Sequence, residues 1–177
     1  HHLPGDVLPP ADAIVNPNCR GDTFPGKMLA GDGVMVYVLL ALRRKLRESA
    51  SALPAEADLS TLLDLVAVGT VADLVPLDVN NRALVGAGLR RLRAGQGCAG
   101  LRALIEVSGR ETAKLTAADI GFAIAPRLNA AGRLEDMAIG IECLLTDDAI
   151  QAAELANILH GINAERRGVQ QQLTAEG

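Results

Sequence analysis

Two short stretches of the sequence carry the residue types that could hold a metal ion. The first is the pair His1 and His2, followed at once by a Leu-Pro-Gly turn at residues 3–5 that can aim both imidazoles into one pocket. The second is Asp73, a lone carboxylate in the apolar segment 69–77. An unpaired buried carboxylate costs several kcal/mol, so such a group usually has a cation or donor as partner. Imidazole and carboxylate together form a ligand set that suits Mn²⁺ or Mg²⁺ at a hydrolytic two-metal site.

Each of these stretches also has an ordinary interpretation. The paired histidines can be the tail of an affinity tag, and Asp73 can be the N-cap of a following short turn. His160, the remaining histidine, fits an ordinary helical position on the surface or between domains. The sequence has no P-loop, no GxGxxG after a strand and no GxSxG, so it gives no support to nucleotide cradling or acyl transfer.

A predicted loop at residues 126–133 (PRLNAAGR) adds candidate substrate contacts. Arg127 and Arg133 flank Asn129 there, and guanidinium and amide donors on a glycine-containing loop can bind DNA phosphates or active-site carboxylates. The alternative is a plain connection between helices in which Arg133 caps nearby carbonyl groups.

Asn16 and Asn18 form a further candidate pair, because they directly follow a predicted buried strand at residues 11–15. Ligands of open α/β sheets bind at the C-terminal ends of the strands. We therefore expect these two asparagines near the substrate.

Helices must position most of these residues. Apolar spacing predicts helices over residues 29–48, 59–68, 80–93, 101–107, 116–125 and 135–145, and a last one from about residue 148 toward the end. Thr116 and Asp119 resemble a capping box, Pro126 should end that helix, and Asp147 is the expected cap of the last one.

One strand and about seven helices indicate a helix-rich α/β fold. The ratio is odd for a doubly wound sheet, so we expect most strands of a parallel sheet to lie upstream of His1. The last helix, about 25 residues long with a polar end, is typical of a connector between domains. We therefore predict one domain part over residues 1–146 and a connector helix over residues 147–177.

Composition excludes several classes of protein. The chain has 177 residues, of which 49% are hydrophobic and 21% charged, so it is too apolar to be disordered. Its three scattered cysteines fit neither a disulfide scaffold nor a zinc site, and no apolar run is long enough to span a membrane. The net charge of −4 gives no overall basic field for nucleic acid. With no signal peptide in view, we expect a cytoplasmic location.

Three motifs of the sequence resemble those of a known superfamily. Residues 1–5 (HHLPG) with 11–18 (ADAIVNPN) resemble the third motif of the DHH phosphoesterase superfamily, and residues 69–77 (GTVADLVPL) resemble its fourth. Residues 126–137 (PRLNAAGRLEDM) resemble a signature of that superfamily's bacterial single-strand-specific exonucleases. The motifs occur in order along nearly the whole chain, which a tag at the first residues does not explain.

The resemblance implies a 5′→3′ exonuclease of DNA repair and recombination that uses Mn²⁺ or Mg²⁺ and acts on single-stranded DNA. Carried over by position, His1, His2 and Asp73 would be catalytic metal ligands. The candidate substrate contacts are Asn16, Asn18, Arg127, Asn129 and Arg133.

The family's remaining metal ligands, including an Asp directly before the histidine pair, would lie upstream of His1. The two-metal site would then be incomplete here, and we expect weak metal binding and no cleavage by this chain alone. The chain would be the C-terminal helical part of a DHH-type domain. No motif in the sequence indicates a particular protein partner, and we expect no contact with a membrane.

Other functions stay open at this level. A DHH phosphodiesterase could instead hydrolyse short oligonucleotides, cyclic dinucleotides or pyrophosphate. A catalytically silent relative could act as a replication scaffold, although the retained His1, His2 and Asp73 argue against it. The plainest alternative is a helical interaction domain that carries a tag remnant.

Overall fold

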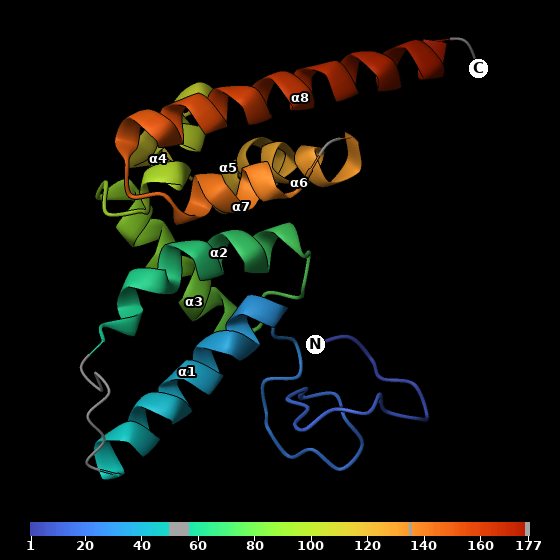
Figure 1. The fold of residues 1–177 in the computed structure, drawn as a ribbon, viewed down its shortest axis with the longest axis vertical. Coiled ribbons are helices and arrows are strands. Elements are labelled where there is room, and N and C mark those ends of the chain that lie inside the picture. The colour runs from blue at the N-terminus through green and yellow to red at the C-terminus, as the bar shows by residue number, and fades with distance from the viewer. Residues whose placement is uncertain (50–56, 135, 176–177) are drawn as a thin grey trace. The chain divides into compact units, whose positions relative to one another are not determined.

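The computed structural model describes residues 1–49, 57–134 and 136–175, and the regular structure in this part of the chain is helical (Figure 1). The chain forms two compact units, residues 1–88 and residues 89–177. Helix-rich architecture is therefore confirmed. No helix in the described ranges is long and apolar enough to cross a membrane.

The helices of the first unit are α1 (Gly31–Glu48), the short 3₁₀ helix η1 (Leu59–Leu62), α2 (Leu63–Ala72) and most of α3 (Val79–Arg93). The second unit holds the end of α3, then α4 (Ala99–Val107), the 3₁₀ turn η2 (Thr112–Lys114), α5 (Ala117–Asp119), the π-helical turn η3 (Ile120–Ile124), α6 (Ala125–Leu134), α7 (Ala138–Leu145) and α8 (Ala149–Ala175).

In the first unit, a long irregular segment of about thirty residues leads into α1, which packs against α2 (Figure 1). Apolar residues of both helices, among them Val36, Val66 and Ala67, are buried. The fully buried Asn81 of α3 donates its side-chain amide to the carbonyls of Met28 and Pro76, at 2.7 and 2.8 Å. It thereby fixes the approach to α1 and the exit from α2, the two places where the candidate site forms.

In the second unit, α8 packs along α4, α6 and α7 (Figure 1). Small residues of α8 such as Ala152 and Ala156 are fully buried, which lets neighbouring helices approach closely. Gly100 serves the same purpose on α4, since a Cβ there would collide with the backbone carbonyl of Cys143. The long last helix is thus present, and it is capped by the carboxylate of Asp148 rather than by Asp147.

The predicted strand at residues 11–15 is wrong for the described chain, because these residues form no strand. Ile14 and Val15 are 41% and 62% exposed. A strand exists only when its backbone pairs with a neighbour, and the part of the chain that the structure describes offers none.

The predicted loop at residues 126–133 is also wrong. Thr116 and Asp119 do form the expected capping box, but the helix continues through the π-helical turn η3 into α6 and contains Pro126. Proline lacks an N–H and clashes with the carbonyl four residues earlier, and the wider π turn just before it relieves both problems. The following helix, α7, begins at Ala138 instead of residue 135.

Candidate active site

The structure brings together His1 and Asp73 from distant parts of the first unit. The Nε2 atom of His1 lies 3.1 Å from Oδ2 of Asp73, with 20% of the first side chain and 38% of the second exposed. The His1 ring lies beside the start of α1, within van der Waals distance of where a Cβ at Gly31 would be. The site therefore forms where the N-terminal residue, the start of α1 and the end of α2 meet.

Asp73 lies at the C-terminal end of α2, not at the start of a turn as the N-cap interpretation required. Its N–H donates to the carbonyl of Gly69 at 2.9 Å, and Leu74 ends the helix with a left-handed φ of 57°. A carboxylate in this place faces the negative end of the helix dipole, which is unfavourable. The His1 imidazole offsets that repulsion when protonated, and so would a metal cation.

His2 lies beside His1 rather than on Asp73. The two ring centroids are 4.2 Å apart with the planes tilted by 49°, and His2 is exposed. Both imidazoles thus belong to one patch, but only His1 contacts the carboxylate.

Asn16 and Asn18 use their side chains to hold the backbone of these histidines. The amide of Asn16 donates to the His2 carbonyl at 2.8 Å, and that of Asn18 donates to the His1 carbonyl at 2.7 Å. Asn18 also donates to the carbonyl of Lys27 at 3.2 Å. The candidate site residues His1, His2, Asn16, Asn18 and Asp73 therefore form one connected group.

Asp32 is a second carboxylate at this site, and sequence reasoning missed it. Burial raises its pKa to about 6, the nearby charge of Asp73 adds to this, and the hydrogen bond from the N–H of Gly33 opposes it. Its Oδ2 atom is buried without a hydrogen-bond partner among the described residues.

The signal for Asp32 was ambiguous because an acidic residue in a first helical turn ordinarily just complements the helix dipole. Gly69 is a more specific sign that a side chain packs against α2 at this point. A Cβ at Gly69 would collide with the Asp32 carboxylate, so this glycine makes room for a charged group against α2.

Of the residues expected to contact substrate from the second unit, Arg127 and Asn129 do not share one surface. Arg127 is buried in α6 and donates Nε to Nδ1 of His160 on α8 at 3.1 Å, and another of its N–H groups to the carbonyl of Ala123. Asn129 is exposed on the same helix, and the side chain of Arg133 lies outside the described residues.

Arg127 has a lowered pKa, mainly because of burial and further because of the charges of Arg167 and Arg110. His160 is therefore more than a plain surface residue, since its Nδ1 atom accepts a hydrogen bond from this partly desolvated cation.

The His1–Asp73 pair fits a divalent cation in its donor types and spacing. Two ligand atoms at neighbouring corners of an octahedron, each about 2.1 Å from the ion, lie about 3 Å apart. The separation of 3.1 Å matches this value. Within the described ranges, no group of three or more His, Cys, Asp or Glu side chains is arranged to hold a metal. These residues alone would supply only part of a coordination shell.

Comparison with known proteins identifies the relationship, although no family model matches the chain. The chain is 54% identical over 179 aligned residues to the single-stranded-DNA-specific exonuclease RecJ of Dickeya dadantii, an alignment that covers 99% of the chain. The chain is homologous to part of RecJ. It spans 31% of that relative's length.

Solved structures of RecJ agree with the sequence comparison. A crystal structure of exonuclease RecJ bound to manganese matches 99% of the chain and 42% of its own, with 39% identity and a TM-score of 0.83. RecJ from Thermus thermophilus in complex with Mg²⁺ matches 81% of the chain and 21% of its own, with 40% identity and a TM-score of 0.69. The fold of the chain is therefore similar to the corresponding part of these RecJ structures.

Proposed function

We propose that this chain is part of a metal-dependent exonuclease that degrades single-stranded DNA in the 5′→3′ direction during DNA repair and recombination. The observation that carries the proposal is the His1–Asp73 pair, two metal-ligand side chains held 3.1 Å apart at the junction of α1 and α2. The shared name of the RecJ relatives supports single-stranded DNA as substrate, rather than cyclic dinucleotides or a silent scaffold. Their Mn²⁺ and Mg²⁺ complexes support either ion as cofactor.

When bound, Mn²⁺ or Mg²⁺ supplies Lewis acidity toward the scissile phosphate and its attacking water. In this chain, Nε2 of His1 and Oδ2 of Asp73 would hold the ion, with the exposed His2 ring beside them. Asp32 adds negative charge behind Asp73 and so favours a cation at this place.

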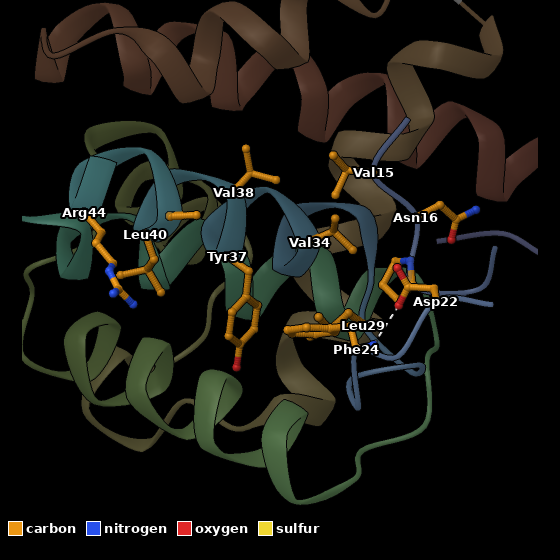
Figure 2. A pocket seen from close by; sticks show the side chains of 12 residues that line it. Val15, Asn16, Asp22, Phe24, Leu29, Val34, Tyr37, Val38, Leu40 and Arg44 are labelled. Atoms are coloured by element: carbon orange, nitrogen blue, oxygen red, sulfur yellow. Dashed lines mark hydrogen bonds between the residues drawn. The ribbon is translucent and has the colours of Figure 1, made fainter. Parts of the chain in front are cut away.

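We also propose where the sheet of the domain packs. A groove of about 680 Å³ lies between α1 and the segment before it, with walls that include Val15, Val34, Val38 and Leu40 (Figure 2). An apolar groove beside a segment without regular structure is a place where a sheet could pack. We place the parallel sheet of a DHH-type domain there, built mostly from strands upstream of His1.

The proposal also divides the chain. Residues 1–146 would belong to the DHH-type domain, and residues 147–177, which include the whole of α8, would form the connector toward a second core domain. A DNA-processing role supports a cytoplasmic location.

Nuclease assays on the full-length gene product test the proposal. Asp73→Asn and His1→Gln should each lower Mn²⁺-dependent release of nucleotides from 5′-labelled single-stranded DNA by at least 100-fold. Asp6→Asn, an exposed carboxylate of the same N-terminal segment, is the matched control and should retain activity. Full activity of Asp73→Asn, or preference of the unaltered protein for a cyclic dinucleotide, would refute the assignment.

A further inference from the structure

We propose that Asn18, assisted by Asn16, is a positioning residue that orients the His1 imidazole toward Asp73 by clamping the backbone of the histidine pair. The inference rests on the proposed function, because it takes His1 and Asp73 as the metal-binding pair. It assigns the two asparagines a role that acts through the histidines rather than on DNA.

The clamp uses amide donors on consecutive carbonyls. Nδ2 of Asn18 donates to the carbonyl oxygens of His1 and Lys27, so both of its N–H bonds are engaged. Nδ2 of Asn16 donates to the His2 carbonyl, and its Oδ1 accepts the backbone N–H of Asn18 at 3.0 Å. The residues on either side of the His1–His2 peptide are thus tied to one turn.

Residues 1–15 make few polar contacts within the described part of the chain. Among the described residues, the recorded hydrogen bonds and ion pairs of residues 1–15 are the two asparagine contacts and the His1–Asp73 pair. Residues 1–15 also lack regular secondary structure. Within the described chain, the two asparagines therefore supply the side-chain hydrogen bonds that hold the backbone of His1 and His2.

The turn that carries the clamp is itself braced. Nζ of Lys27 donates to the carbonyls of Pro17 and Asp22 and lies 3.1 Å from the Asp22 carboxylate. The Phe24 N–H and then Lys27 hold the pKa of Asp22 below its usual range. This closed arrangement gives the asparagines a fixed base, which pre-organises the ligand that they support.

The amide group is chemically specific for this task. A carboxylate of the same shape at position 18 would place an oxygen against the carbonyls of His1 and Lys27 and repel both. Asn18→Asp therefore removes the clamp with almost no change in volume, and Asn16→Asp does the same at the His2 carbonyl while it keeps the acceptor for the Asn18 N–H.

The test measures Mn²⁺ affinity of the full-length gene product by titration calorimetry, with nuclease kinetics alongside. Loss of a residue that orients a metal ligand weakens binding by roughly 10–100-fold. We expect such a loss for Asn18→Asp and a smaller one for Asn16→Asp. In both variants kcat should recover at saturating Mn²⁺, with an unchanged KM for single-stranded DNA.

Two controls separate the outcomes. Thr116→Ala removes a helix cap in the second unit and should leave Mn²⁺ affinity unchanged. If Thr116→Ala weakens Mn²⁺ binding as much as Asn18→Asp does, the effect of the asparagine comes from general destabilisation and the inference is wrong. Unchanged Mn²⁺ affinity of a folded Asn18→Asp variant, or a raised KM for DNA alone, would overturn the inference. If Asn18→Asp does not fold, the Asn16→Asp result decides. Unchanged Mn²⁺ affinity of Asp73→Asn would instead refute the proposed function.

Discussion

Asp32 shows how one side chain changes the electrostatics of the whole site. Its side chain is partly buried near Asp73, and its buried Oδ2 atom has no hydrogen-bond partner in the described chain. Folding therefore places two like charges close together, and among the described residues the ion-pair partner of Asp73 is His1. This arrangement opposes folding and favours a bound cation, as is common where a protein trades stability for function.

The raised pKa of Asp32 predicts a pH dependence of stability in metal-free protein. Below about pH 4 the group is protonated in both folded and unfolded chains. As the pH rises toward about 6, the unfolded chain releases the proton first, so the free energy of unfolding should fall and then level off. Asp32→Asn should remove this decline in urea denaturation series with a chelator present. The exposed Asp12→Asn is the control that should retain it.

Gly69 gives a second prediction at the same place. Alanine normally stabilises a helix interior relative to glycine, but a Cβ here collides with the Asp32 carboxylate. We expect Gly69→Ala to lower the free energy of unfolding by about 1–3 kcal/mol. In the Asp32→Ala background the same change should become neutral or stabilising. A double-mutant cycle measures the coupling, and additive effects would contradict this account.

At the scale of elements, the start of α5 depends on a local cap. Thr116 accepts the N–H of Asp119 at 3.2 Å, and Asp119 accepts the N–H of Thr116 at 2.9 Å. Thr116→Ala should lower the free energy of unfolding by about 1 kcal/mol, and Thr116→Ser should keep it near the original value. Thermal unfolding followed by circular dichroism compares them, and equal stability of all three would show that the cap is dispensable.

The same elements show what the sequence could predict. Apolar periodicity located α1, α3 and α4 to within a few residues, because a helix that buries one face has apolar residues three or four positions apart. It failed at residues 11–15 and at Pro126, where the outcome depends on a partner strand and on a π turn. Neither of these leaves a signal in local composition.

The candidate site was predictable to a similar degree. The types and order of His1, His2 and Asp73 pointed to one place, because motif residues must converge to act. Asp32 and the asparagine clamp could not be foreseen, since each depends on where a backbone far away in the sequence comes to lie.

At the scale of the whole molecule, the chain spans 31% of the length of the Dickeya dadantii relative yet holds two compact units of its own. The helix α3 runs across the boundary between the units at Gly88 and Leu89. Each unit has a buried apolar core, but the first also exposes the groove beside α1.

That groove gives a prediction about stability, which differs between the full-length gene product and the 177-residue chain. If a sheet covers the groove in the full-length gene product, Leu40→Lys buries a charge there and should lower the free energy of unfolding by several kcal/mol. In the 177-residue chain alone, Leu40 is 37% exposed on α1, so the same change should alter stability by less than about 0.5 kcal/mol and weaken binding of an apolar dye. Ile150→Lys on α8, where the side chain is 73% exposed, is the control and should be tolerated at either length. Equal tolerance of Leu40→Lys at both lengths would show that nothing covers the groove, and the sheet would then have to be placed elsewhere.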